Sequence, residues 1–475
     1  MRCAALFLFI SSAYAADRFP VDWPKLDREL LEYYSALVRI DTSNPPGNET
    51  KAVNYIRPIL DREHIPYQVF ALQPDRANIV ARLKATGPGN GSKRPIIVMG
   101  HMDVVGVQRE KWSVDPFAAI RKDGYIYGRG TQDDKDNLTT GLMLMLTLKR
   151  LNVPLDRDVI FIAEAGEEGT SSVGINYLVG EHWDAIGGDL KGAEFALAEG
   201  GGGESRQGKV RYVDITTTEK VPRTTRLIAH GTAGHGSVPR LDNPVVHLAE
   251  AVAKVGTWQP PMRLNDTTRT YFERLASISS PEDADRYNHI ADPQRSAAIQ
   301  RYFAEHELTN YSMLRTSVVP TIIKAGFRSN VIPSEAEATI DIRALPDEDV
   351  NKLYAELRRV IDDPAVEVVA GDPGSQRPAS APSRLDSEMF HVLENVTKQL
   401  YPGAVTLPSM LTGATDMAQL RAKGVQAYGI GPIVDEKDRN IGGAHSDDER
   451  LEEAALYRFM EFLWDTVTEI AAPRK

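Results

Sequence analysis

The stretch Pro95-Ile96-Ile97-Val98-Met99-Gly100-His101-Met102-Asp103 decides the fold class of this chain. Its first five residues are an apolar run, which predicts a short buried strand, and the run ends at a glycine and a histidine. Similar runs follow at 158–163, 195–198 and 425–430, and residues 138–151 are apolar nearly all round, as in a helix buried against a sheet. This alternation predicts an α/β domain with a mixed, mostly parallel central sheet flanked by helices.

Acids and histidines stand where these runs give way to glycine-rich or polar turns. Ligands of α/β sheets bind beyond the carboxyl ends of the strands, so we expect these side chains to lie together. They are His101, Asp133, Glu167, Glu168, Glu199 and His445. Two imidazoles and three carboxylates suit a pair of divalent ions that share one carboxylate, and the remaining glutamate can activate water. The set therefore indicates hydrolysis.

The first two segments each have a simpler interpretation when they are taken alone. His101 and Asp103 lie on the same side of an extended chain, so the Asp103 carboxylate can hold the second ring nitrogen of the histidine. The alternative is a surface turn whose histidine is satisfied locally. Asp133 follows a Gly-x-Gly turn and precedes the apolar helix, where it can be shared by two cations or can only cap the helix.

The remaining segments are also ambiguous one by one. Glu167 and Glu168 are adjacent carboxylates, which repel each other unless a cation or a proton relieves them. A solvated charged loop is the alternative. Glu199 precedes four glycines, which allow the backbone to approach a ligand closely, and His445 lies in a glycine-rich loop before a helix. Both of these signals are weak in isolation.

Together, the order and spacing of the segments resemble the di-zinc family of aminoacylases, glutamate-releasing carboxypeptidases and succinyl-diaminopimelate desuccinylases. The resemblance extends from roughly residue 27 to residue 470. The matching segments are Gly-His-Met-Asp at 100–103, Gly-Arg-Gly-x-x-Asp-x-Lys at 128–135, Glu-Glu-Gly at 167–169, Ala-Glu-Gly at 198–200 and Gly-Ala-His at 443–445.

The resemblance implies two Zn²⁺ ions per chain and a role for each residue of the set. By this resemblance, His101 and Glu199 bind one ion, Glu168 and His445 bind the other, and Asp133 bridges the two. The peptide bond between Asp133 and Asp134 is expected to be cis. Glu167 is expected to act as the general base and then as the general acid, and Asp103 to orient His101. Imidazole and carboxylate ligands also accept Co²⁺ or Mn²⁺.

Four further residues are implicated only by the resemblance. His235, in the loop 231–237, corresponds to an oxyanion-stabilising histidine that often reaches across a dimer into the partner's site. Asn330 and Arg343 correspond to residues that grip the substrate carboxylate, for which the planar fork of arginine is suited. Thr415 corresponds to a loop that contacts the substrate backbone.

Two departures from the family pattern stand out. Asp136 occupies a position where a glycine usually follows the lysine, which can alter the turn after the bridging acid. A polar, helix-prone insert at about 265–310 lengthens the inserted domain relative to compact members of the family. The insert leaves the closure of that domain and the oligomeric state open.

The domain organisation follows from a change of pattern in the middle of the chain. Alternating strands are expected at 224–231 and 336–344, and a Pro- and Gly-rich linker at 371–383. We predict a signal peptide at 1–15, a catalytic domain at 16–221 and 376–475, and an inserted lid or dimerisation domain at 222–375.

The N-terminus predicts export. Arg2 precedes an apolar stretch and the triplet Ala13-Tyr14-Ala15, which reads as a secretory signal peptide, whereas a buried N-terminal helix is the alternative. The single cysteine, Cys3, would leave with that peptide, so neither disulfides nor cysteine ligands are expected in the periplasmic or secreted protein. A net charge of −11 argues against nucleic-acid and anionic-membrane partners, and no later segment is predicted to span a membrane.

The predicted activity is zinc-dependent cleavage of an amide bond beside a free carboxylate, of the carboxypeptidase or dipeptidase type. An N-acyl-amino-acid hydrolase (aminoacylase) is the nearest alternative, with a small peptide or an N-acyl amino acid as substrate and a homodimer through the inserted domain. Two alternatives from other classes are a non-catalytic, metal-dependent binding protein and an exported structural protein.

Overall fold

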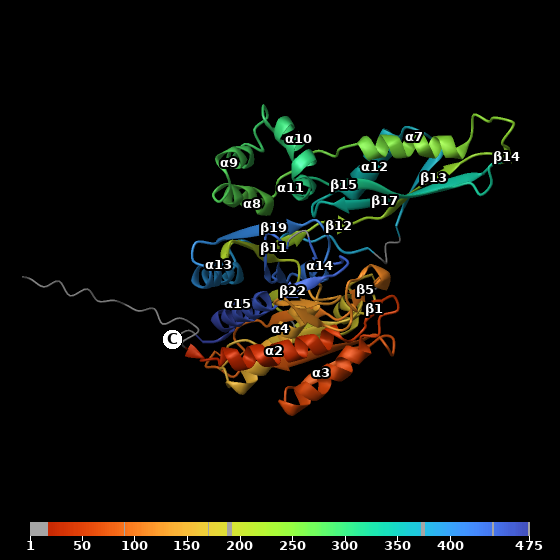
Figure 1. Ribbon diagram of the computed structural model, residues 1–475. Helices are drawn as coiled ribbons and strands as arrows, with labels where there is room; N and C mark the ends of the chain where they lie inside the picture. Colours follow the sequence, from red (N-terminus) through yellow and green to blue (C-terminus); the bar gives the residue numbers. More distant parts are fainter. Residues whose placement is uncertain are drawn as a thin grey trace, which may run out of the picture.

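Residues 18–89, 91–169, 171–187, 192–371, 376–438 and 441–473 are described by a computed structural model. Figure 1 shows a larger lower body, built from both ends of the chain, and a smaller upper body built from its middle. The predicted signal peptide at 1–15 lies outside the described residues. Within the described ranges, no helix combines the length and the apolar character needed to cross a membrane.

A ten-stranded mixed sheet forms the centre of the larger body. In spatial order its strands are β2 (Tyr67–Ala71), β3 (Ala77–Leu83), β8 (Val159–Glu164), β4 (Ile96–His101), β9 (Phe195–Ala198), β20 (Gln426–Gly429), β11 (Lys209–Glu219), β10 (Gly202–Arg206) and β21 (Ile433–Asp435), with β19 (Val405–Leu411) paired to β11. The run from β8 through β4 and β9 to β20 is parallel, whereas β2 and β3 are antiparallel additions. The sheet confirms the predicted α/β class.

Strand β4 is apolar throughout because both of its faces are covered. Ile96 and Val98 belong to the hydrophobic core on one side of the sheet, and Ile97 and Met99 belong to the core on the other side. A strand buried on two faces reads as a continuous apolar run rather than an alternating one. The same geometry carries the chain to the carboxyl edge of the sheet, where His101 is the last residue of the strand.

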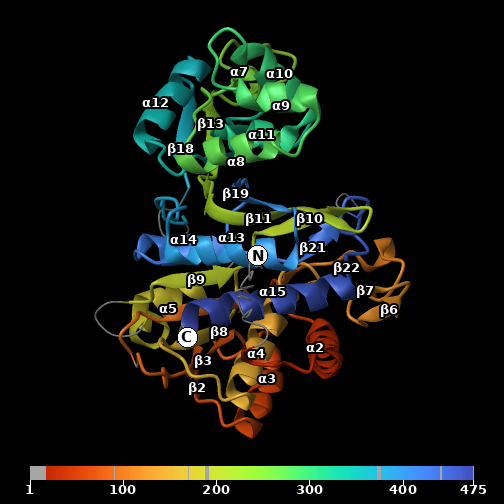
Figure 2. The ribbon, with the colours of Figure 1, turned by 90° about the vertical axis from the view of Figure 1, so that its left-hand side faces the viewer.

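Helices cover the two faces of this sheet unequally (Figure 2). One core is shared by α2 (Trp23–Val38), α3 (Thr50–Arg62), α4 (Lys135–Arg150), α13 (Glu388–Leu400) and α15 (Glu453–Ala471). The other face is packed by α5 (Ile175–Glu181), α6 (Trp183–Gly187) and α14 (Met417–Ala422). Helix α4 is buried along nearly its whole length, which explains why its sequence is apolar on every side.

The upper body contains a second sheet. Its strands are β12 (Val221–Pro222), β13 (Thr225–His230), β15 (Ser317–Ala325), β17 (Glu335–Ala344) and β18 (Val366–Ala370). Helices α7 (Pro244–Thr257) and α12 (Val350–Ile361) share a hydrophobic core with this sheet. A short pair, β14 (Gly234–His235) and β16 (Val331–Ile332), lies at the far tip of this body (Figure 1).

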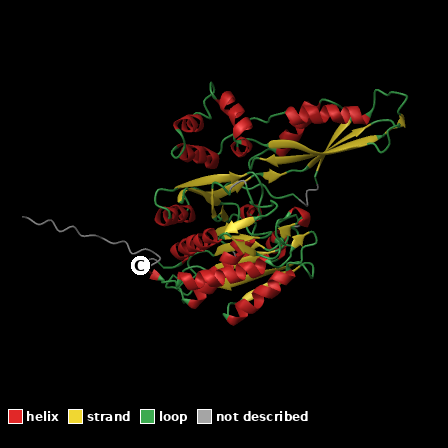
Figure 3. Cartoon of the chain, in the orientation of Figure 1, coloured by secondary structure: helices red, strands yellow, loops and turns green. Residues whose placement is uncertain are grey.

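The insert predicted at about 265–310 forms a group of helices of its own (Figure 3). They are α8 (Asp266–Ala276), α9 (Pro281–Asn288), α10 (Ser296–His306) and α11 (Leu308–Met313). Phe272, Tyr287 and Phe303 form their core, with the rings of Phe272 and Phe303 stacked at 5.8 Å. Helix α8 packs on β19 of the larger body, and Arg274 donates to the Thr406 carbonyl at 2.8 Å. The insert therefore connects the upper body to the larger body.

Small elements complete the edge of the larger body around the carboxyl ends of its strands. They are β1 (Ser43–Asn44), β5 (Val104–Val105), the 3-10 helix η1 (Arg109–Lys111), β6 (Ile120–Lys122), β7 (Tyr125–Tyr127) and β22 (Arg450–Glu452). Strand β22 pairs with β7, and β1 pairs with β5. These pairings bring the C-terminal loop that contains His445 back to the N-terminal half of the chain.

Candidate dinuclear metal centre

The structure brings the five predicted metal ligands together at one edge of the central sheet. His101 is the last residue of β4, Glu168 and Glu199 follow β8 and β9, Asp133 precedes α4, and His445 lies in the loop before β22. Their donor atoms fall into two groups, in each of which the atoms lie within 4.8 Å of one another: His101, Asp133 and Glu199, and Asp133, Glu168 and His445. Asp133 is common to both groups.

The two carboxylate oxygens of Asp133 face different imidazoles. Oδ1 lies 2.8 Å from Nε2 of His101, and Oδ2 lies 3.0 Å from Nε2 of His445. The second acid of each group is also near its histidine, with Glu199 Oε2 at 3.9 Å from His101 Nε2 and Glu168 Oε1 at 2.8 Å from His445 Nε2. This is the arrangement that a carboxylate shared by two cations requires.

The charges of the centre favour cations. Burial raises the pKa of Glu199 well above its usual range, and the neighbouring carboxylates of Glu167 and Asp133 raise it further. Hydrogen bonds to Asp133 and Glu168 raise the pKa of His445 to about 10. Clustered, buried carboxylates that draw protons in this way also attract divalent cations. A set of imidazole nitrogens and carboxylate oxygens fits zinc, cobalt or manganese.

Asp103 organises the centre differently from the prediction. The ring Nδ1 of His101 lies 2.9 Å from the backbone carbonyl of Asp103, whereas the nearest oxygen of its carboxylate is at 3.6 Å. The carboxylate instead accepts from three consecutive backbone N–H groups, those of Gly166, Glu167 and Glu168, at 2.8–3.1 Å. Asp103 is better placed to shape the loop after β8, because that loop offers it three donors.

Glu167 is buried, and its carboxylate contacts an arginine. Its Oε1 accepts from Nη2 of Arg377 at 2.5 Å, and Nη1 of the same guanidinium lies 3.1 Å from Asp416 Oδ1. Burial raises the pKa of Glu167 to about 8, although the Arg377 charge opposes that shift. Neither Arg377 nor Asp416 is among the predicted site residues. The one available signal was an arginine in a linker otherwise rich in proline, glycine and alanine.

A second buried acid, Glu449, connects the two loops that carry Asp133 and His445. Its carboxylate accepts from Arg129 at 2.6 Å and from the backbone N–H of Gln132 at 2.8 Å. His445 itself has a φ of 64°, a left-handed conformation that is uncommon for a residue other than glycine. Sequence reasoning missed Glu449, because an acid before a strand gives no local sign of partners 317 and 320 positions away.

The turn into α4 carries two further acids. The peptide bond between Asp133 and Asp134 is cis, and Asp134 accepts from the backbone N–H of His101 at 3.1 Å. Asp136, the departure noted above, is fully buried in the first turn of α4 and lines the same cavity as the ligands. Burial, followed by the charge of Asp134, raises the pKa of Asp136 well above its usual range.

A cavity of about 410 Å³ opens onto the ligands. Leu411, Ile430 and Pro432 supply apolar wall, and Gly200 and Gly201 supply bare backbone. Thr415, predicted to contact substrate, lies in the wall of this cavity. Its hydroxyl donates to Glu219 Oε2 at 2.7 Å.

Five predicted residues do not line this cavity: His101, Asp103, His235, Asn330 and Arg343. The last three lie in the upper body. His235 and Asn330 are exposed at the tip of the upper body, where the Asn330 carbonyl accepts from the Gly236 N–H at 2.8 Å beside the β14–β16 pair. Arg343 lies on β17, where its Nε is 3.1 Å from Asp341. Within the described residues of a single chain, the structure therefore leaves these three residues apart from the metal ligands.

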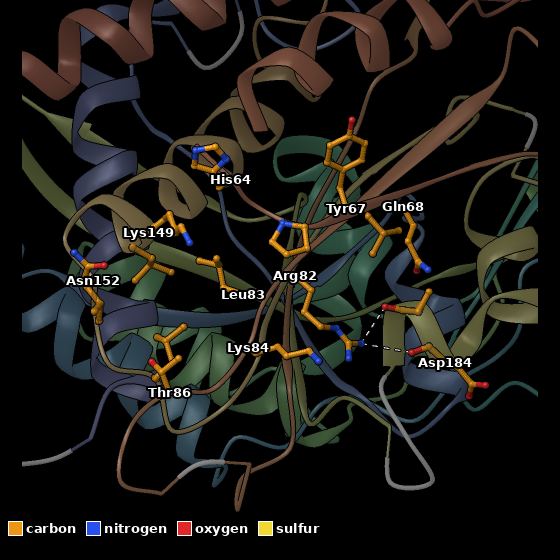
Figure 4. A pocket seen from close by; sticks show the side chains of 16 residues that line it. His64, Tyr67, Gln68, Arg82, Leu83, Lys84, Thr86, Lys149, Asn152 and Asp184 are labelled. Carbon is orange, nitrogen blue, oxygen red and sulfur yellow. Dashed lines mark hydrogen bonds between the residues drawn. The ribbon is translucent and has the colours of Figure 1, made fainter. Parts of the chain in front are cut away.

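A larger cavity of about 820 Å³ lies elsewhere, beside β2, β3 and the end of α4 (Figure 4). Its lining includes Tyr67, Arg82 and Lys149, and none of the predicted site residues. Arg82 donates to the backbone carbonyl of Ala185 at 3.0 Å. Size alone does not mark the site, because the convergent ligands line the smaller cavity.

A mixed α/β sheet that gathers two imidazole-and-carboxylate groups around one shared aspartate is the framework of a dinuclear metallohydrolase. The family model described as "Peptidase family M20/M25/M40" matches residues 97–469, and the chain belongs to this family. It is a metal-dependent hydrolase of amide bonds, and one solved structure of the same fold is described as a dinuclear metal binding peptidase of the M20 family.

Individual relatives differ in their described activities. The chain is 28% identical over 376 residues to an N-fatty-acyl-amino acid synthase/hydrolase of Xenopus tropicalis, covering 78% of this chain and 71% of the relative. It is 25% identical over 445 residues to a probable succinyl-diaminopimelate desuccinylase of Staphylococcus aureus, covering 92% and 96%. A metallo-carboxypeptidase of the M20 family from Sulfolobus solfataricus shares the fold, with a TM-score of 0.68 and 17% identity over 92% of this chain and 98% of the other.

Proposed function

We propose that this protein is a di-zinc hydrolase that cleaves the amide bond beside a free carboxylate in small peptides, as a carboxypeptidase or dipeptidase. The observation that carries the proposal is the position of Glu167. It is the one acid of the predicted set that belongs to neither ligand group, and it lies in the wall of the cavity onto which both groups open.

Each residue of the site has a separate role in the proposed hydrolysis. Two bound divalent cations would lower the pKa of a bound water and polarise the carbonyl of the substrate. Asp133 would hold the two metal positions at a fixed separation, and Glu167 would take a proton from water and return it to the leaving amine. Leu411, Ile430 and Pro432 would contact the apolar part of the substrate beside the scissile bond.

An N-acyl-amino-acid hydrolase remains the second candidate, because its substrate also carries an amide beside a carboxylate. The two relatives compared by sequence above are described as an N-fatty-acyl-amino acid synthase/hydrolase and a probable desuccinylase, and these descriptions support the second candidate. The test is a comparison of kcat/KM for dipeptides, N-acetyl amino acids and N-long-chain-acyl amino acids on the metal-loaded protein. Preference for dipeptides supports the proposal, and a tenfold or greater preference for either acyl series, about 1.4 kcal/mol, overturns it.

The metal has its own test. We expect elemental analysis of the purified protein to find about two zinc ions per chain, and chelation to abolish turnover. Reconstitution with Zn²⁺, Co²⁺ or Mn²⁺ then identifies the metals that support catalysis. A protein that turns over fully after exhaustive chelation would contradict the proposal, and so would a purified protein that holds a metal other than zinc.

We further propose that two copies of the chain associate through the upper body. Strand β15 pairs only with β17 among the described residues, and it exposes Val319, Ile322 and Ile323, with Phe327 beyond its end. An exposed apolar edge strand is a surface suited to pairing with a second chain. Association there would also give the exposed His235 a second chain to reach.

Ultracentrifugation tests this association. We expect a dimer for the native protein and a monomer for Ile323→Glu, with turnover lost in parallel. Leu72→Glu is the control, because Leu72 is an exposed leucine of the larger body. A native monomer with full activity would contradict the proposal.

Export is the remaining proposal, and the apolar N-terminal stretch followed by Ala13-Tyr14-Ala15 supports it. We expect the protein recovered outside the cytoplasm to begin at Ala16. N-terminal sequencing of that fraction is the measurement, and a product that keeps Met1 would contradict it.

A further inference from the structure

The buried guanidinium of Arg377 lies between the proposed general base and the crossing from the upper body to the larger one. Its Nη2 donates to Glu167 twice, to Oε1 at 2.5 Å and to the backbone carbonyl at 3.2 Å. One nitrogen thereby contacts both the side chain and the main chain of the base. The Arg377 side chain therefore has fewer accessible rotamers than an arginine that makes a single contact.

Asp416 holds the guanidinium from the opposite side. Its Oδ1 lies 3.1 Å from Nη1 of Arg377, and its side chain is 1% exposed. Arg377 itself is 14% exposed, so this ion pair is shielded from solvent and is weakly screened. The guanidinium is therefore fixed in place by one carboxylate while it contacts another.

The backbone of Arg377 connects this arrangement to the base of the upper body. Arg377 follows β18 on the return crossing, and its carbonyl accepts from Nη1 of Arg223 at 2.9 Å. Arg223 lies in the upper body just after the outgoing crossing, between β12 and β13. The first residues of the upper body are thus in contact with the residue that holds Glu167.

We propose that Arg377 is a positioning residue that orients Glu167 and transmits the position of the upper body to it. The inference rests on the proposed role of Glu167 as general base. Rotation of the upper body would move Arg223, and the contact between Arg223 and Arg377 would carry this movement to the guanidinium. Productive orientation of the base then depends on the position of the upper body.

The test is steady-state kinetics on metal-loaded variants of the full chain. Arg377→Gln is expected to lower kcat about 10- to 100-fold with KM within about twofold, because a misplaced catalytic group costs rate rather than binding. Arg377→Lys keeps the charge near Asp416 and is expected to recover part of the loss. Arg384→Gln is the matched control, since Arg384 directly follows the linker that contains Arg377 and is 67% exposed.

A double variant separates positioning from other roles. If Arg377 acts through Glu167, then Glu167→Gln and the double variant Glu167→Gln/Arg377→Gln have the same kcat, because the second change removes nothing further. Independent, multiplicative losses would overturn the inference, and so would an Arg377→Gln variant whose only change is a raised KM. Arg223→Gln is expected to lower kcat by a smaller factor, and an unchanged kcat would overturn the transmission from the upper body.

The outcomes also separate this inference from the proposed function. A Glu167→Gln variant with native turnover would remove the proposed base itself. An inactive Glu167→Gln variant beside a fully active Arg377→Gln variant would remove only the positioning role. Metal content and melting temperature, measured on each variant, exclude a loss that arises from misfolding.

Discussion

Glu167 and Glu168 are neighbours in the chain with different surroundings. Glu168 lies 2.8 Å from His445, in a ligand group, whereas Glu167 contacts Arg377 and has no place in either group. The Asp103 carboxylate accepts the backbone N–H of both residues, which fixes the loop that turns the two side chains apart. Two consecutive residues thus supply a candidate base and a candidate metal ligand.

Replacement of Glu167 by glutamine should separate catalysis from metal binding. We expect Glu167→Gln to lose roughly 10²- to 10⁴-fold in kcat, the usual contribution of general acid–base catalysis, while it keeps both metal ions. Single-turnover kinetics and elemental analysis on the same sample measure the two properties. Turnover close to the native rate would show that another group takes the proton.

Asp103 offers a second test at the level of single residues. Asp103→Ala removes the acceptor of three backbone N–H groups, so the loop that carries Glu168 should lose its shape. We expect metal affinity or activity to fall about 10- to 100-fold, as is typical when a group that supports metal ligands is lost. Competition with a chromogenic chelator measures this affinity, and an unchanged affinity would contradict the role.

Among the elements, β4 and α4 approach each other closely at Gly100. A Cβ at this position would lie 2.5 Å from the backbone nitrogen of Leu138 and 2.7 Å from its Cα. Backbone atoms cannot yield as a flexible side chain can, so the strand or the helix must move. Gly100 is adjacent to His101, and α4 begins directly after the turn that carries Asp133.

Gly100→Ala is therefore expected to lower the free energy of unfolding by about 1–3 kcal/mol, the usual cost of overpacking, and to weaken metal binding. Denaturant unfolding and metal titration measure the two effects. Gly106→Ala is the control, because a Cβ at Gly106 meets nothing within 4 Å. Equal stability of the two variants would contradict the close packing.

Helix α15 carries a buried acid whose ionisation should make stability depend on pH. Burial, followed by the charges of Glu461 and Glu469, raises the pKa of Asp465 from 3.8 to about 7. An acid whose pKa is raised in the folded state ionises more easily in the unfolded chain. It therefore lowers stability progressively as the pH rises from about 4 to about 7.

Asp465→Asn removes that ionisation. We expect the variant to gain stability relative to the native protein as the pH rises from about 4 to about 7, with the difference constant above that range. Urea unfolding at several pH values measures the difference. A difference that is the same at both ends of the range would show that Asp465 titrates normally.

For the whole molecule, the metal centre should couple folding to metal binding. Its ligands come from both ends of the chain, so an unfolded chain cannot assemble them. We expect zinc at about 100 times its Kd to stabilise the fold by about 2.7 kcal/mol for each ion bound, seen as a higher melting temperature than that of the chelated protein. His445→Ala should reduce this shift, and equal melting temperatures with and without zinc would contradict the coupling.

The sequence by itself determined the α/β class and indicated the set of candidate ligands that the structure brings together. Apolar runs such as 95–99 indicate a strand that is buried on both faces. The turn at the end of each run is also visible in the local sequence. Because parallel strands end at a common edge, side chains such as His101 and Glu199 could be predicted to meet there. Local pattern was sufficient for these conclusions.

Only the tertiary structure decided which groups support the ligands and where the upper body places its residues. Arg377 and Glu167 are 210 positions apart, and Glu449 and Gln132 are 317 positions apart. Contacts of such separation depend on how the sheet and the crossings pack, and no periodicity in the sequence records them. The same packing leaves His235 exposed at the tip of the upper body, away from the ligands of its own chain.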